Sequence, residues 1–248
     1  WSLRTGYYSP ATTIQNWQSL HKYGAVVFPL FLKEHFGSRI IKSIWDGCAS
    51  AAGPNWWLAT DVAIRDASAD SLNLRVLFPR FAVWNLFTGP WARGSDYYPD
   101  AAGYPSPTTS FPGYSSIKRF VTEVTAYPAS ITVPDSLKPD NLGTDYILLR
   151  NTSAFPAGLE IAFTGDRTKP WAIQVLGLPA NVADPGQAIY LDSVVYDSTV
   201  TTIRIPNAAQ FDKIVVIPSI VYGNTLRANY SLIVAPLGEG LLQPNGGE

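Results

Sequence analysis

The chain has 248 residues, a formal net charge of -1, 46% hydrophobic residues and 15% charged residues. A near-neutral charge excludes an electrostatic nucleic-acid binder, which would carry a basic excess. No run of apolar residues approaches the roughly 18 that span a membrane. A single cysteine excludes an internal disulfide framework.

Helical periodicity dominates the first 98 residues, which also hold seven of the eight tryptophans. Apolar residues recur at helical spacing in four stretches, 23–31, 40–45, 57–66 and 74–84. Trp45 belongs to the apolar stripe of the second stretch, and we expect Leu58 and Val62 of the third to face inward. Ser38 and Ser71 are the N-caps that we expect for the second and fourth helices. Pro79 lies inside the fourth pattern, and we expect it to kink or split that helix.

The rest of the chain predicts a connecting loop and a β domain. Residues 99–117 are rich in tyrosine and proline and predict an ordered surface loop. From residue 118 the apolar period becomes two, with turn signals between short runs. The predicted strands are 120–125, 145–149, 159–163, 172–175, 188–191, 201–205, 213–217 and 229–234. We therefore predict an α+β fold, with a helical lobe (1–98) followed by an antiparallel β-sandwich (118–248) of jelly-roll or immunoglobulin type.

The residues that ligate transition metals are too few and too far apart for a site. Neither H-E-x-x-H nor H-x-x-E-H occurs in the chain. His21 and His35 would stand about 21 Å apart along one helix, which one ion cannot bridge. Cys48 lies among small residues and is typical of a buried apolar side chain. We expect no transition-metal site and no catalytic residue within these 248 residues.

Two further candidates have a structural alternative. Asp96 and Asp100 flank Tyr-Tyr-Pro and could bind calcium with backbone carbonyls; the alternative is ordinary turn chemistry. Calcium is thus the one cofactor candidate inside the chain. Trp171 could be a sugar platform, although the alternating pattern around it favours a core residue.

Two separated motifs resemble one known family. The stretch YGAVVFPLFLKEHFG at 23–37, followed by IIKSIWD at 40–46, resembles part of the secreted gluzincin-type zinc metallopeptidases and their relatives. FAVWNLFTG at 81–89 is similar to a later helix end of that group. The tyrosine-rich loop and a carboxy-terminal β-sandwich agree with the group's layout. The likeness is in sequence over about residues 8–100 and in architecture beyond them.

The resemblance implies that the H-E-x-x-H helix and the third zinc ligand lie amino-terminal to Trp1, so no catalytic residue carries over onto this chain. Either the chain is the carboxy-terminal half of a longer zinc metallopeptidase, or it is a relative that kept the scaffold without the metal. The helical lobe would then bury an aromatic face against an amino-terminal lobe or another protein chain. We expect these contacts at Trp1, Trp17, Trp56 and Trp57.

Three functions follow as expectations. The first is a non-catalytic portion of a secreted metallopeptidase-like protein, with a scaffold and docking role. The second is an extracellular structural or assembly protein of a cell-surface layer or filament, which would form homo-oligomers. The third is a carbohydrate-binding module, with Tyr190, Tyr196 and Tyr222 as its aromatic candidates. All three place the chain outside the cell or at its surface.

Overall fold

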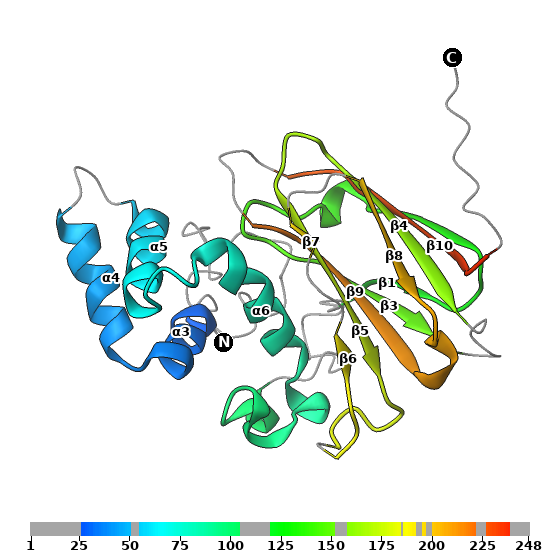
Figure 1. Ribbon diagram of the computed structural model, residues 1–248, viewed down its shortest axis with the longest axis horizontal. Helices are drawn as coiled ribbons and strands as arrows, with labels where there is room; N and C mark the ends of the chain where they lie inside the picture. The colour runs from blue at the N-terminus through cyan, green and yellow to red at the C-terminus, as the bar shows by residue number, and fades with distance from the viewer. Residues whose placement is uncertain are drawn as a thin grey trace.

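A computed structural model describes residues 26–50, 55–104, 120–151, 158–184, 186–191, 195–196, 200–221 and 227–238. Helices occupy one side of the molecule and two layers of β-sheet the other (Figure 1). The order of elements is α-helices first and strands afterwards, which confirms the predicted α+β class. No described helix has the length and apolar character needed to cross a membrane.

The four predicted helices are present. They are α3 (Val27–Phe36), α4 (Arg39–Ser50), α5 (Trp56–Ala67) and α6 (Leu74–Leu86). Pro79 lies within α6 without splitting it, so the expected split is wrong. Three short 3-10 turns follow, at Gly89–Trp91 (η1), Gly94–Asp96 (η2) and Ala101–Gly103 (η3).

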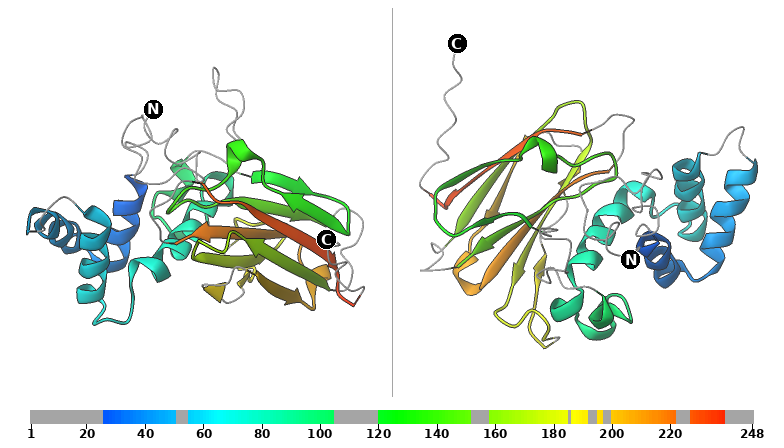
Figure 2. Two further views of the ribbon diagram at one scale, coloured as in Figure 1. Left: turned by 90° about the horizontal axis from the view of Figure 1, so that it is seen from above. Right: turned by 180° about the vertical axis from the view of Figure 1, so that it is seen from behind.

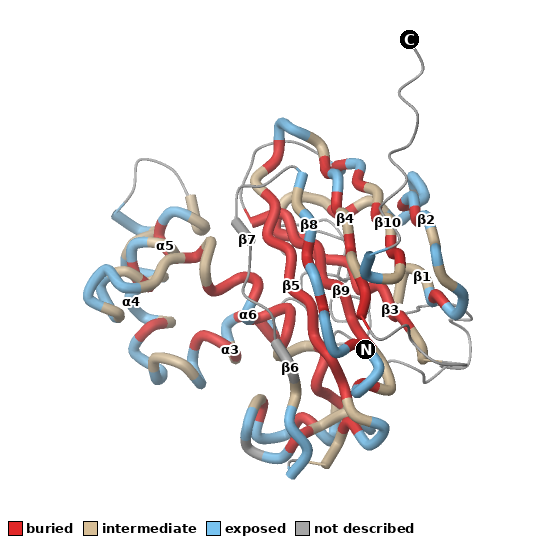
Figure 3. The backbone as a smooth tube through the Cα atoms, turned by 45° about the vertical axis from the view of Figure 1, so that its right-hand side comes forward, coloured by how far each residue is buried: buried red, intermediate tan, exposed pale blue. Residues whose placement is uncertain are grey.

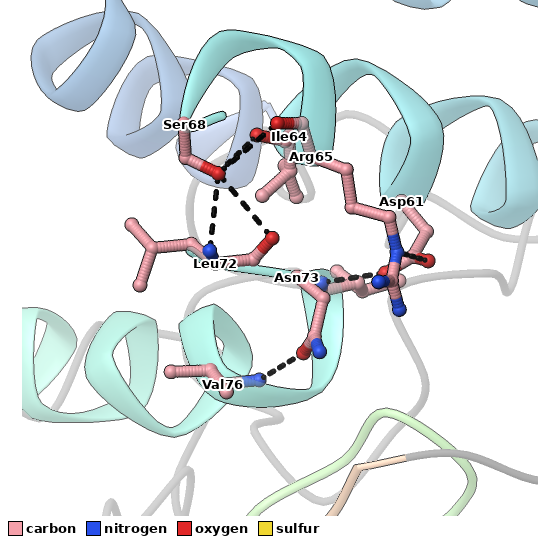
Figure 4. A network of polar contacts seen from close by, with 8 residues as sticks. Asp61, Ile64, Arg65, Ser68, Leu72, Asn73 and Val76 are labelled. Carbon is pink, nitrogen blue, oxygen red and sulfur yellow. Dashed lines mark hydrogen bonds and ion pairs between the residues drawn. The ribbon is translucent and has the colours of Figure 1, made fainter. Parts of the chain in front are cut away.

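The turn between α5 and α6 corrects the predicted cap. Asn73, not Ser71, begins α6, because its side chain accepts a hydrogen bond from the N–H of Val76 at 3.0 Å. Ser68 closes α5 by donating to the carbonyl of Ile64 at 2.8 Å and accepting from the N–H of Leu72 at 3.0 Å (Figure 4). The short connection is therefore fixed by side chains at both helix ends.

The strands form two sheets. The bounds are β1 Phe120–Val124, β2 Ala129–Thr132, β3 Tyr146–Arg150, β4 Leu159–Gly165, β5 Trp171–Leu178, β6 Tyr190–Leu191, β7 Val195–Tyr196, β8 Val200–Ile205, β9 Lys213–Ile220 and β10 Tyr230–Pro236. One sheet has the order β1-β3-β9-β5-β6, with β7 also on β5, and the other has the order β2-β10-β4-β8. Among the described strands, all pairings are antiparallel except that of β1 with β3, which is parallel.

The two sheets enclose one hydrophobic core. It contains residues of both, among them Ile147, Phe163, Val216 and Leu232, all of them buried. Trp171 belongs to it and is fully buried, so the core interpretation is confirmed and the sugar-platform alternative is wrong. Alternate residues of each strand supply this core, as the period of two predicts.

The outer face of the β1-β3-β9-β5-β6 sheet is buried as well, by the helices. Leu148, Leu176 and Ile217 pack in one cluster with residues of α6, and Ala172 and Val221 pack in another with α3, α5 and α6. The hydroxyl of Tyr146 donates to the carbonyl of Ala82 in α6 at 2.7 Å. Two further views show the helices beside the stacked sheets, with α6 nearest to them (Figure 2).

This packing joins the predicted lobe and the predicted sandwich. Two of the three hydrophobic clusters in the described residues contain side chains from both. The boundaries at 98 and 117 remain predictions, and the loop beyond residue 104 lies outside the described residues. In the part that is described, the helices complete the sandwich by covering a sheet face.

Gly177 in β5 tests how tightly this core is packed. A Cβ atom at Gly177 would lie 2.6 Å from the ring of Phe211, a distance that forces a shift. We expect Gly177→Ala to lower the free energy of unfolding by about 1–3 kcal/mol. Gly103→Ala is the matched control, since no atom lies within 4 Å of its Cβ position. Urea unfolding of both variants is the measurement, and equal midpoints would contradict the described packing.

Candidate functional site

The helical hairpin formed by α4 and α5 carries exposed apolar side chains. Trp45 is 72% exposed, Val62 48% and Leu58 45%. Leu58 and Val62 are one turn apart, so they lie on the same face of α5. Three large apolar side chains are thus exposed on two helices that pack on each other, and exposed apolar area is what a protein partner would cover. We call these three residues the hairpin surface.

Helix α4 is the least buried of the four helices. Ile40 is its single buried residue, although Ile41 and Ile44 pack partly against the helical cluster. Figure 3 shows α4 mostly as exposed and intermediate backbone, whereas α6 is largely buried. Trp45 was predicted to belong to the buried stripe of α4, and this is wrong. The ion pair between Lys42 and Asp46 flanks Trp45 on both sides in sequence and marks the solvent-facing side.

Small residues hold α4 and α5 together. A Cβ atom at Gly47 would lie 3.1 Å from the Cβ of Ala59, so the two backbones approach closely at this point. Ala59 and Ala63 are buried on the same side of α5. The two helices are therefore held firmly together, while Trp45, Leu58 and Val62 remain exposed.

The four predicted partner contacts have different positions. Trp56 and Trp57, in the first turn of α5, are partly buried and pack against the helical cluster. Trp1 and Trp17 lie outside the described residues. A role in partner contact stays a prediction for all four. The predicted inward placement of Leu58 and Val62 is wrong, because the structure exposes both of them, and Trp45 as well, more than Trp56 or Trp57.

The two calcium candidates lie on separate short turns. Asp96 ends η2 and its carboxylate is 3.9 Å from the Nε of Arg93. Arg93 is buried and donates to the carbonyls of Val182 and Gln187. Asp100 precedes η3, where its backbone carbonyl accepts from the N–H of Gly103. Calcium binding at these residues remains a prediction, and the guanidinium beside Asp96 already supplies a positive charge.

His35 is packed among aromatic rings. Its ring centroid lies 4.3 Å from that of Phe31 and 4.8 Å from that of Trp84. Its Nδ1 lies 3.2 Å from the carbonyl oxygen of Phe31. Burial lowers the pKa of His35 from its usual value, although the contact with Phe31 opposes this effect. Among the described residues, no three His, Cys, Asp or Glu side chains could hold a metal ion together.

A buried carboxyl inside the sandwich is a feature that the sequence reasoning missed. Asp145 is fully buried, and its Oδ2 accepts a hydrogen bond from the hydroxyl of Tyr230 at 2.8 Å. Burial raises the pKa of Asp145 to about 8, against the smaller opposite effect of Tyr230. The only signal in the sequence was that Asp145 begins the predicted strand 145–149, in register with Ile147 and Leu149, which face the sandwich core.

Comparisons with known proteins add little. No protein-family model matches the chain, and no curated protein matches it. Among solved structures, the pre-peptidase C-terminal domain of a collagenase from Bacillus anthracis matches with a TM-score of 0.29 and 15% sequence identity. The match covers 46% of this chain and 92% of that domain. At this TM-score the likeness carries no argument about function, and the gluzincin resemblance stays a prediction.

Trp45→Ser tests whether the hairpin surface is dispensable for folding. Because Trp45 is exposed and the two residues have similar helix propensities, we expect the free energy of unfolding to change by less than about 0.5 kcal/mol. Trp56→Ser is the control and should cost more than about 1 kcal/mol, because Trp56 packs on the helical cluster. Urea unfolding compares them, and an equal loss in both would show that Trp45 belongs to the core.

A second prediction concerns the titration of His35. Its lowered pKa means that the folded chain disfavours the protonated ring. The neutral ring's contribution to stability is therefore present above the unfolded value near 6.5 and is lost as the pH falls. We expect an NMR titration midpoint for His35 below 6.5, and a weaker loss of stability in acid for His35→Phe. The His21→Gln variant leaves one imidazole signal and makes the assignment; a midpoint above 6.5 would contradict the packing.

Proposed function

We propose that this chain is the non-catalytic carboxy-terminal portion of a secreted metallopeptidase-like protein, and that it acts as a scaffold and docking unit. The observation that carries the proposal is the hairpin surface on helices that are packed onto a β-sandwich. Such an arrangement holds an apolar platform in a fixed place, which suits contact with a second lobe or chain.

The distribution of ligand residues supports a non-catalytic role. The whole sequence has two histidines and one cysteine. His35 is occupied by its aromatic neighbours and by the carbonyl of Phe31. A hydrolytic zinc needs three protein ligands and an open position. In this proposal, those ligands are supplied by a segment outside these 248 residues.

The motifs behind the gluzincin resemblance fold as helices of a single lobe. The stretch 23–37 contains α3, the stretch 40–46 lies in α4, and 81–86 forms the end of α6. The rings of Phe28 and Phe31 pack against that of Phe81, at centroid distances of 5.0 and 5.5 Å. The separated motifs thus meet in one aromatic core, which is what a shared backing lobe requires.

The alternatives receive less support. An assembly protein of a cell-surface layer would also use an exposed apolar platform, and its partner would be a second copy of the chain. For a carbohydrate-binding module, Tyr190 and Tyr196 lie on the short edge strands β6 and β7, and Tyr222 lies outside the described residues. Neither alternative explains why the two sequence motifs pack together.

Two measurements test the proposal. The purified 248-residue chain should show no zinc-dependent peptide hydrolysis and no stoichiometric zinc in equilibrium dialysis. Peptide mapping of the native protein by mass spectrometry should reveal an H-E-x-x-H segment, either upstream in the same polypeptide or in a tightly bound partner. Hydrolysis by the isolated chain that a chelator abolishes would contradict the proposal, and so would a native protein without such a segment.

A further inference from the structure

One short segment reaches into both the helical core and the sandwich core. Leu142 is 2% exposed and belongs to the cluster formed with the helices. Three residues later, Asp145 is fully buried. Its hydrogen-bond partner, Tyr230, belongs to the cluster between the two sheets. Residues 140–145 therefore connect the two packed regions directly.

The backbone of this segment is held in a costly conformation. Leu142 has a φ of 51°, in the left-handed region that a bulky side chain avoids, at a cost on the order of 1 kcal/mol. Hydrogen bonds maintain it: the N–H of Leu142 donates to the carbonyl of Ile220, and the N–H of Asp145 donates to that of Pro218, both at 3.0 Å. The N–H of Gly143 donates to the carbonyl of Asp140 at 2.9 Å. The strain persists only while these contacts are intact.

The buried carboxyl of Asp145 is the group in this segment whose ionisation would destabilise the packing most. Its Oδ1 is buried and has no hydrogen-bond partner among the described residues, so there the carboxyl is incompletely satisfied. Its hydrogen-bond partner Tyr230 packs against the rings of Phe163 and Trp171, at centroid distances of 5.8 and 5.6 Å. A neutral carboxyl is tolerable in such a site, whereas a carboxylate demands water or a cation.

We propose that residues 140–145 form a pH-sensitive latch, in which ionisation of Asp145 releases the strained backbone and withdraws Leu142 from the helical core. The latch is closed while the carboxyl is protonated. Opening admits water to the start of β3 and loosens the contact between the helices and the sheet.

The surrounding charges set the direction of the response. Tyr230 on β10 is the titratable group in contact with Asp145. The other charged groups described at this end pair elsewhere: Asp140 accepts from the N–H of Arg227, and Asp166 accepts from Thr168 and is close to Lys169. Among the described residues, none of these forms an ion pair with Asp145. Burial raises the pKa of Asp145 to about 8, so the carboxyl is protonated at neutral pH.

The sign of the stability change follows from this raised pKa. In the unfolded chain the carboxyl titrates near 3.9, as free aspartate does. Between that value and about 8, the folded chain binds more protons than the unfolded chain. The stability contributed by the protonated form is therefore complete below about 4 and is lost as the pH rises through the folded pKa.

Hydrogen-exchange mass spectrometry of the full chain at pH 6 and pH 9 tests the latch. After correction for intrinsic exchange rates, we expect the wild type to lose protection between pH 6 and pH 9 in residues 138–145, α3 and α6. This loss should be about tenfold larger than the loss in Asp145→Asn over the same pH range. That variant stays neutral and keeps an oxygen for Tyr230. Asp96→Asn, on an exposed turn, is the matched control and should behave as the wild type does. An equal pH response in Asp145→Asn would overturn the proposal.

Two further measurements keep the proposal testable if Asp145→Asn does not fold. A carboxyl NMR titration of the wild type should place the Asp145 midpoint above 6, and a midpoint near 4 would overturn the latch. Leu142→Gly relieves the backbone strain but removes the side chain, so its helices should exchange at pH 6 as rapidly as those of the wild type do at pH 9. Unchanged exchange in the helices would show that Leu142 does not couple the two regions.

Discussion

The structure depends on the burial of one sheet on both of its faces. In β5 and β9, nearly every residue from Trp171 to Leu178 and from Lys213 to Ile220 is buried. One set of alternate side chains fills the sandwich and the other meets the helices. Each large apolar side chain contributes about 1.5–3 kcal/mol when it is buried. The sheet therefore needs the helices to keep its outer face out of water, so the helical lobe and the sandwich stabilise each other.

The burial of both sheet faces also explains why α4 and α5 carry exposed apolar side chains. Helix α6 uses its apolar residues on the sheet and on α3, which leaves α4 and α5 to pack mainly on each other through Gly47 and Ala59. Trp45, Leu58 and Val62 are the large apolar side chains of these two helices that then remain at the surface. The hairpin surface is thus a consequence of how the sheet is covered, and it is available for contact with another lobe or chain.

Much of this fold could be predicted from residue patterns. The eight expected strands all correspond to observed ones, because alternation is a strong signal when one face is buried. Two strands were missed: β2 is four residues long and follows Pro128, and β7 has two residues. The parallel pairing of β1 with β3 was also missed, since pairing depends on contacts between distant residues.

The site was harder to predict than the fold. Periodicity assigned Trp45 to the apolar stripe of α4. Whether such a stripe is buried depends on which element packs against it, and no described helix covers the side of α4 that carries Trp45. Asp145 is polar in a position that the pattern marks as inward, and only tertiary contacts show that it is enclosed with Tyr230. The capping residue of α6 was displaced by two positions, because Ser71 and Asn73 are both good caps and the turn geometry selects between them.

The central claim is that the helices and the sandwich form one cooperative structure through the shared sheet. The most direct measurement is urea unfolding followed at the same time by far-ultraviolet circular dichroism of the helices and by the fluorescence of the sandwich residue Trp171, in a variant whose other tryptophans are replaced by phenylalanine. The account predicts a single transition with coincident midpoints. Separate transitions, with the helices lost first and the sandwich intact, would contradict it.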